Sequence, residues 1–215
     1  MEKETPTPYP HAAKCGTSRR FLVLTDLHAY SFLPATEGEP SHLAVDKAEL
    51  KLTNLNKNPV AHLHACIADH SITADYIICC GDLGHRADQQ GIRFSWNFLN
   101  DLQLRIGAKA TFATVGNHDV DSRFKDEEPN PFEFLKGLNP AFPFSAAADF
   151  DKYWSRNFTV TVDPPYRYLV LNTCSSHGYE KEYERGLVSP WTLGEIRKVL
   201  SAQDSFCLLY TSRCV

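Results

Sequence analysis

The stretch TFATVGNHD, residues 111–119, runs from a short apolar segment into a glycine and three polar residues. It predicts a strand over residues 111–115 that ends at Gly116 and Asn117. Two upstream segments share this pattern. Residues 21–25 read as a strand buried on both faces that stops at Asp26, and residues 76–80 read as a second buried strand that stops at Gly81-Asp82.

Helical patterns alternate with these strands. Residues 60–69 have a helical pattern, and apolar residues recur between residues 92 and 106 at spacings of four, three, three and four, with Gly107 placed to end that helix. This order predicts an α/β fold with a largely parallel sheet. Strand ends of a parallel sheet share one edge, where open α/β sheets bind ligands.

The later sequence predicts further elements. Residues 147–156 favour a helix, and residues 158–162 and 168–172 favour two strands joined through residues 163–165. Ser189 and Pro190 then suit the N-cap and first position of a helix that ends near Leu200.

Two segments are predicted to lie outside this regular framework. Residues 29–58 are polar, with weak helical character over 46–56, and residues 122–146 are rich in Pro, Phe and acids, which favours a loop with short helical turns. We expect both to form a rim or lid over the ligand-binding edge.

Composition narrows the class of protein. The 215 residues are 43% apolar and 12% aromatic, enough for a sizeable core, and acids outnumber bases 26 to 22. The acidic balance indicates no stable nucleic-acid partner. No apolar run could span a membrane, and the N-terminus lacks a secretory signal. We therefore expect a soluble, cytoplasmic protein whose seven cysteines are mostly buried thiols.

Polar residues after the three strands form one candidate site. Taken singly, each cluster is explained by a turn or a cap. Together they supply two carboxylates, two imidazoles and one amide, a donor set suited to Mn, Fe or Zn. The five residues are Asp26, His28, Asp82, Asn117 and His118.

The motifs D-x-H, G-D and G-N-H-D, in this order, resemble those of the calcineurin-like metallophosphoesterases over roughly residues 20–205. The resemblance implies a layered α/β sandwich that is incomplete at the C-terminus. It also implies that Asp26 and His28 bind one metal, that Asp82 bridges two metals, and that Asn117 binds the second. His118 would face the substrate, where it stabilises charge or protonates the leaving oxygen. Two divalent ions (Mn, Fe or Zn) about 3.5–4 Å apart would activate a hydroxide in such a site.

Several positions depart from the family pattern. His85 stands where many relatives carry an aspartate thought to orient the catalytic histidine, and Asp88 is the candidate substitute. We read Asp119 as a supporting residue or helix cap. A later histidine and a G-H-x-H motif are missing, and after His118 only His177 remains. We therefore expect at most one metal to be well held and catalysis to be poor in this chain.

These observations predict three regions: a disordered tail over residues 1–19, an incomplete metallophosphoesterase domain over 20–206, and a non-native tail over 207–215. The last nine residues match the translation of a transposon mosaic-end repeat joined to its reverse complement. The alternative for the end of the chain is a genuine edge strand over residues 206–210.

Two functions are compatible with these motifs. The first is a hydrolase that cleaves a phosphomonoester or phosphodiester, with a small molecule or nucleotide as substrate. The alternative is a non-catalytic binding or scaffold protein that keeps the fold and lacks a complete metal site. The substrate and the oligomeric state are left open.

Overall fold

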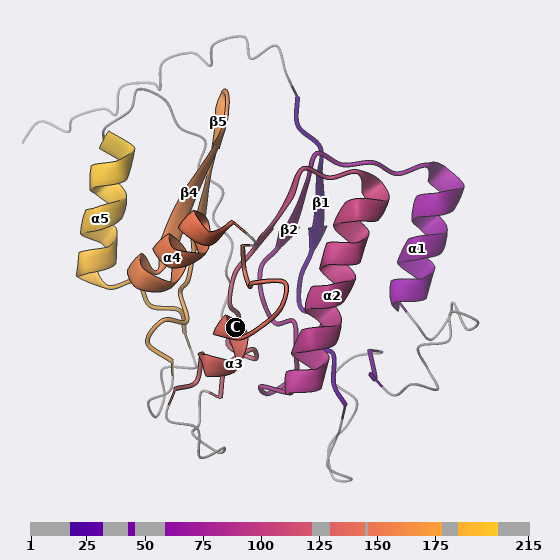
Figure 1. Ribbon diagram of the computed structural model, residues 1–215, viewed down its shortest axis with the longest axis horizontal. Helices are drawn as coiled ribbons and strands as arrows, with labels where there is room; N and C mark the ends of the chain where they lie inside the picture. The colour runs from indigo at the N-terminus through magenta and orange to yellow at the C-terminus, as the bar shows by residue number, and fades with distance from the viewer. Residues whose placement is uncertain are drawn as a thin grey trace, which may run out of the picture.

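Three short strands form a parallel sheet in the order β1-β2-β3 (Figure 1). They are β1 (Phe21–Leu24), β2 (Tyr76–Cys79) and β3 (Ala110–Ala113). The computed structural model describes residues 18–31, 43–45, 59–121, 130–144, 146–177 and 185–201. Helix α1 (Pro59–His70) precedes β2, and α2 (Gln89–Ile106) connects β2 to β3. The predicted alternation of strands and helices is confirmed.

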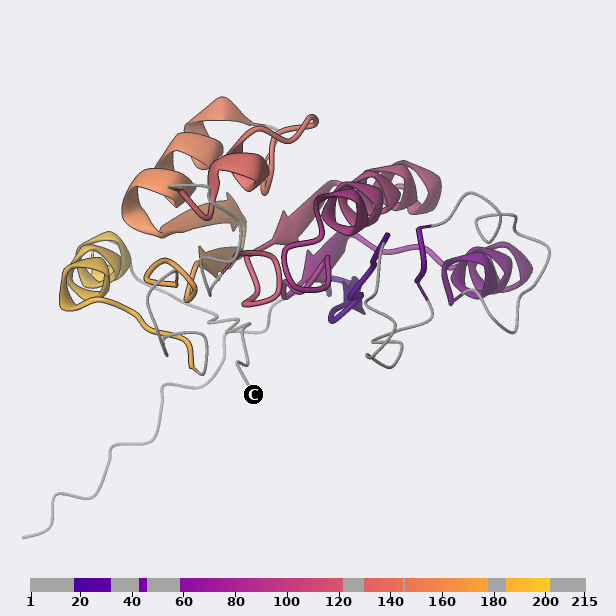
Figure 2. The same cartoon turned by 90° about the horizontal axis from the view of Figure 1, so that it is seen from below.

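The two faces of this sheet have different coverings. Thr111 on β3 donates its hydroxyl hydrogen to Gln103 of α2 over 2.8 Å, so α2 lies on this face (Figure 2). Side chains alternate along a strand, so Phe112 belongs to the opposite face. There its ring centroid lies 4.7 Å from that of Tyr168, a residue of the second sheet.

The second sheet is an antiparallel hairpin of β4 (Phe158–Asp163) and β5 (Tyr166–Leu171). Thr159 donates to Asp149 of α4 (Ala147–Arg156), so this helix lies on one face. On the other face Leu171 packs in a small cluster with Ile196 of α5 (Pro190–Ser201). Figure 2 shows the hairpin between α4 and α5. The layered α/β fold class is therefore confirmed.

Local signals for the helix ends are also confirmed. Gly107 ends α2 with a φ of 69°, a left-handed conformation in which glycine is unstrained. At the start of α5, the Ser189 hydroxyl oxygen accepts a hydrogen bond from the backbone N–H of Thr192 over 3.0 Å.

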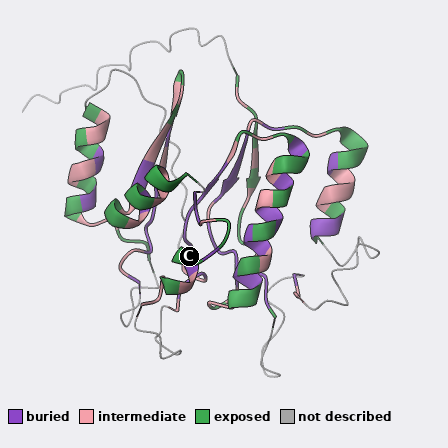
Figure 3. Cartoon of the chain, viewed as in Figure 1, coloured by how far each residue is buried: buried purple, intermediate pink, exposed green. Residues whose placement is uncertain are grey.

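The prediction that β1 is buried on both faces is wrong. Val23 is 56% exposed and Phe21 is 37% exposed (Figure 3). Among the described residues β1 pairs only with β2, so it is an edge strand of this sheet. An apolar run alone does not distinguish an edge strand from a central one.

The predicted lid over residues 122–146 is corrected for its described part. Residues 130–144 contain a short helix, α3 (Glu133–Lys136), and contribute to the main core. Phe142 is fully buried against Trp96, whose indole N–H donates to the backbone oxygen of Pro140 over 2.7 Å. Phe142 and Phe144 are buried in the main core, and Phe132 and Phe134 pack against it, because burying aromatic surface is more favourable than leaving it over an open site.

Other predictions fall outside the described residues. These are the tail over residues 1–17, the weak helix over 46–56, and the final segment over 206–215. Within the described part of the chain, every helix is too short or too polar to cross a membrane. Of the four cysteines that the structure describes, Cys79 and Cys174 are buried, as expected, whereas Cys66 and Cys80 are only partly buried.

Candidate metal centre

The loops that follow β1 and β2 run side by side at the carboxyl edge of the sheet. The backbone N–H of His28 donates to the carbonyl oxygen of Asp82 over 2.9 Å, and that of Ala29 donates to Leu83 over 3.0 Å. This pairing extends the sheet pattern past the strand ends and brings the D-x-H and G-D motifs together.

Three of the candidate residues have strained backbones. Asp26, His28 and Asp82 have φ values of 54°, 45° and 53°, in the left-handed region that residues other than glycine seldom adopt. Such strain persists only where the surrounding structure enforces it, and it concentrates at functional sites. The backbone here is shaped to present these side chains.

The two motif glycines permit a close approach between loops. A methyl group added at Gly81 would overlap the backbone of Gly116, and one added at Gly116 would overlap the backbone and carboxylate of Asp82. The loops after β2 and β3 can therefore lie this close together only because both positions are glycine.

Asp26, His28 and Asp82 bring their side chains together. The Nε2 atom of His28 lies 3.9 Å from Oδ1 of Asp26 and 4.0 Å from Oδ2 of Asp82. The three donor atoms lie within 4.8 Å of one another. Two ligands of one ion with metal bonds of about 2.0–2.2 Å lie at most about 4.4 Å apart, and both separations measured from His28 fall within this limit. Two carboxylates and an imidazole therefore fit a divalent cation.

The carboxylate of Asp82 is oriented by a second contact. The backbone N–H of His118 donates to its Oδ1 over 2.8 Å, which leaves Oδ2 toward His28. Asn117 lies directly before His118 in the turn after β3, at this same edge. Its role as a ligand of a second metal stays a prediction.

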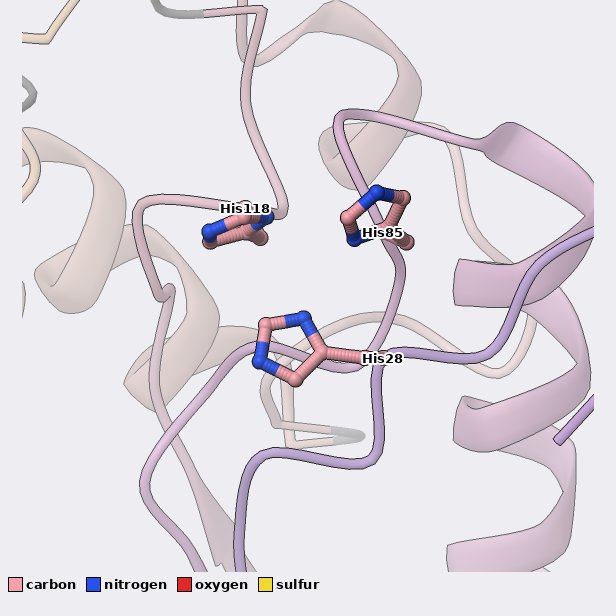
Figure 4. Close-up of side chains that lie close together, drawn as sticks. All are labelled: His28, His85 and His118. Atoms are coloured by element: carbon pink, nitrogen blue, oxygen red, sulfur yellow. The ribbon is translucent and has the colours of Figure 1, made fainter. Parts of the chain in front are cut away.

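Three histidine rings gather beside the carboxylates (Figure 4). The ring centroid of His118 lies 4.6 Å from that of His28 and 5.3 Å from that of His85, and the rings of His85 and His118 are stacked at an interplanar angle of 24°. From the sequence, His85 was only the residue that stands where many relatives carry an aspartate, and no role was predicted for this histidine. Its position three residues after Asp82 was the one signal that could have placed it here.

Asp88 does not take the place of the missing aspartate. Its Oδ1 accepts from the backbone N–H of Gly91 and so caps α2, and its Oδ2 accepts from the N–H and hydroxyl of Ser31. Capping a helix start satisfies an otherwise unpaired N–H group, and the cap and the Ser31 contacts together occupy both carboxylate oxygens of Asp88.

Asp119 locks two loops together beneath the site. Its carboxylate accepts from the backbone N–H of Gly84 over 3.0 Å and from that of Gly116 over 2.9 Å. Burial, with a further contribution from the neighbouring carboxylate of Asp82, raises the pKa of Asp119 to about 7. These contacts agree with the predicted supporting role.

The remaining described histidines lie elsewhere. His177 is buried, with Nε2 3.4 Å from the backbone oxygen of Arg185. On α1, His62 and His70 are exposed, and the His64 ring packs edge-on against Phe98. These four histidines therefore have packing or surface positions, whereas His11 and His42 fall outside the described residues.

Comparisons with known proteins now bear on this arrangement. The family model for calcineurin-like phosphoesterases matches residues 19–196, which include all three strand-end motifs. A comparison with curated proteins finds no match. The family is one of metal-dependent phosphoester hydrolases, and its members typically bind divalent metals. This chain belongs to the calcineurin-like phosphoesterase family.

Proposed function

We propose that this protein hydrolyses a phosphomonoester or a phosphodiester at the carboxyl edge of the β1-β2-β3 sheet. The observation that carries the proposal is the placement of Asp82. One of its carboxylate oxygens accepts from the His118 backbone, and the other faces His28 and Asp26. The predicted metal ligands and the predicted acid therefore share one small region.

Asp26, His28 and Asp82 are the residues that would hold a divalent cation, and Asn117 would contribute to a second. Such a cation, when bound, would act as a Lewis acid that polarises a phosphoryl oxygen and lowers the pKa of a water molecule. This mixed set of carboxylate oxygens and imidazole nitrogen admits Mn, Fe or Zn. The first cation would have three protein ligands and the second only two, so the first would be bound more tightly.

His118 is placed to act on the substrate. Its ring lies beside that of His28 but is not part of the set formed by Asp26, His28 and Asp82. It can therefore face a phosphoester bound next to that set. A histidine in this position can donate a proton to the leaving oxygen. The hydrogen bond from Ala87 to the backbone oxygen of His118, 2.8 Å long, helps to fix the turn that carries it.

Access to the site supports a small-molecule or nucleotide substrate. The side chain of Asp26 is 58% exposed, whereas those of His28 and Asp82 are 20% and 12% exposed. Solvent therefore reaches the centre from the Asp26 side. A cytoplasmic location belongs to the same proposal, and a buried thiol such as that of Cys79 is typical of proteins in a reducing compartment.

The test compares hydrolysis of p-nitrophenyl phosphate and bis-p-nitrophenyl phosphate, with and without Mn²⁺. We expect a Mn²⁺-dependent rate on one of the two esters that disappears in Asp82→Asn. His118→Gln should lower that rate by about 10²–10⁴-fold, the usual contribution of a general acid. The ester that reacts identifies the protein as a monoesterase or a diesterase.

Asp69→Asn is the matched control, because Asp69 lies exposed on α1, away from the site. It should leave the rate unchanged. Hydrolysis rates that do not depend on Mn²⁺, or that persist in Asp82→Asn, would contradict the proposal. Saturable Mn²⁺ binding without hydrolysis of either ester would favour the non-catalytic alternative.

A further inference from the structure

Three imidazoles from three different loops surround one small space (Figure 4). His28 follows β1, His85 follows β2 and His118 follows β3. A ring nitrogen from each lies within 4.8 Å of those of the other two. All three residues are partly buried, and the rings converge although they are far apart in the sequence.

The backbone holds these histidines in place. The N–H of His28 donates to Asp82, and the N–H of His85 donates to the backbone oxygen of Ala29 over 3.0 Å. The turn after His85 is bonded to His118 through Ala87, which itself has a φ of 60°. Backbone hydrogen bonds between the three loops therefore fix the positions of the three histidines.

The donor chemistry of this group differs from that of the neighbouring carboxylates. Imidazole nitrogens suit Zn, Cu and Ni, whereas carboxylate oxygens suit Mg and Mn. Three histidines are a known ligand set for zinc. Asp26, His28 and Asp82 form an oxygen-rich set, and His28, His85 and His118 form a nitrogen-only set.

We propose that His28, His85 and His118 bind one Zn²⁺ ion at a site that shares His28 with the carboxylate-containing set and uses neither Asp26 nor Asp82. Tetrahedral zinc with bonds of about 2.0–2.1 Å needs its ligands about 3.3–3.4 Å apart. Side-chain rotation of the three histidines can close the difference from the present separations. A fourth position is left for water or another small ligand.

Occupancy of this site also inhibits the proposed phosphoester hydrolysis, a consequence that rests on the proposed function. His28 belongs to both donor sets, so zinc bound by the three imidazoles withdraws it from Asp26 and Asp82. The same ion engages His118, the proposed proton donor. Mn²⁺ at the carboxylates and Zn²⁺ at the imidazoles are therefore mutually exclusive.

The binding test titrates the full chain with Zn²⁺, and in a separate experiment with Mn²⁺, and measures each affinity by calorimetry. His85→Gln should weaken Zn²⁺ binding at least about 10–100-fold, since losing even an indirect partner of a metal-bound histidine costs that much. Mn²⁺ affinity should stay within about twofold. Asp26→Asn should weaken Mn²⁺ binding and leave the Zn²⁺ affinity unchanged. His62 is an exposed histidine on α1, so His62→Gln should change neither affinity. Equal Zn²⁺ affinity in His85→Gln and the wild type overturns the site.

A second measurement needs no variant. X-ray absorption at the zinc edge of the wild-type protein loaded with one Zn²⁺ should show three imidazole ligands and no sulfur. One imidazole with carboxylate oxygens, or sulfur from a cysteine, overturns the proposal. Failure of the proposed catalysis would appear separately, as a lack of Mn²⁺-dependent ester hydrolysis in a protein that still shows the three-imidazole spectrum.

Discussion

The backbone N–H of His118 lies 2.8 Å from Oδ1 of Asp82, while Oδ2 of the same carboxylate lies 4.0 Å from Nε2 of His28. One side chain therefore connects the ends of all three parallel strands. Because Oδ1 is held by a backbone donor, Oδ2 is already directed toward the place where a cation would bind, and little side-chain freedom remains to be lost.

Asp82→Asn should remove metal binding and preserve the fold. The amide oxygen of Asn can still accept from His118, but the negative charge that attracts a cation is gone. A ligand at a hundred times its dissociation constant stabilises a protein by about 2.7 kcal/mol. We expect Mn²⁺ to raise the Tm of the wild type and to leave that of Asp82→Asn unchanged in a thermal melt.

Asp82→Ala and Asp69→Asn complete this experiment. Asp82→Ala also deprives the His118 N–H of its acceptor, so its Tm without metal should fall below that of Asp82→Asn. Asp69→Asn should retain the full Mn²⁺ shift, because Asp69 is an exposed residue of α1. A normal Mn²⁺ shift in Asp82→Asn would exclude this residue as a ligand.

The convergence of the site was predictable because it follows from local signals and one topological rule. Apolar runs ending at Asp26, Gly81 and Gly116 specify short strands, and strands that alternate with helices pair in parallel. Parallel strands then deliver their terminal residues to one edge. Neither step needs knowledge of how distant side chains pack.

The failures arose where distant packing decides the outcome. Val23 is exposed because β1 is an edge strand, which depends on the partner of the strand and not on its own composition. Asp88 was the predicted substitute for the aspartate whose position His85 takes, but which side chain it contacts depends on how the turn after β2 folds. Ser31 and Gly91, which engage Asp88, are close to it only in the folded chain.

Gly116→Ala should destabilise the protein and impair the site together. The added methyl group overlaps both the backbone and the carboxylate of Asp82, and these rigid atoms cannot move aside cheaply. Overpacking of this kind costs about 1–3 kcal/mol. Urea denaturation should show the loss, and Mn²⁺ titration should show weaker binding because Asp82 is displaced.

Gly194→Ala is the matched control for that substitution. Gly194 lies within α5, and a methyl group added there meets no atom within 4 Å. Alanine is favoured over glycine inside helices, so this variant should gain about 0.5–1 kcal/mol. If both substitutions destabilise the protein equally, the overlap with Asp82 is not the cause.

Tyr153→Phe should loosen the end of β3 by removing one hydroxyl group. This hydroxyl is fully buried, lies 2.8 Å from Oγ1 of Thr114 and accepts from the backbone N–H of Val115 over 3.1 Å. Leaving a buried donor unsatisfied costs about 1–3 kcal/mol. The urea midpoint should fall by the corresponding amount, and hydrogen exchange at Val115 should accelerate more than exchange within α1. Unchanged exchange at Val115 would contradict this role.

Acid should weaken the junction between the two sheets through Asp163. Its Oδ2 accepts from Nε of Arg19 over 2.7 Å and from the hydroxyl of Tyr76 over 2.6 Å, and these hydrogen bonds hold the pKa of Asp163 well below its usual range. A depressed carboxyl pKa adds stability above the unfolded value of about 3.9, and this stability is lost as pH falls through the folded pKa. Asp163→Asn should therefore lower the urea midpoint at pH 7 and do so by less at pH 3. Asp69→Asn should show no such pH dependence, and a gap between wild type and Asp163→Asn that is as wide at pH 3 as at pH 7 would show that the ionised carboxylate does not hold the sheets together.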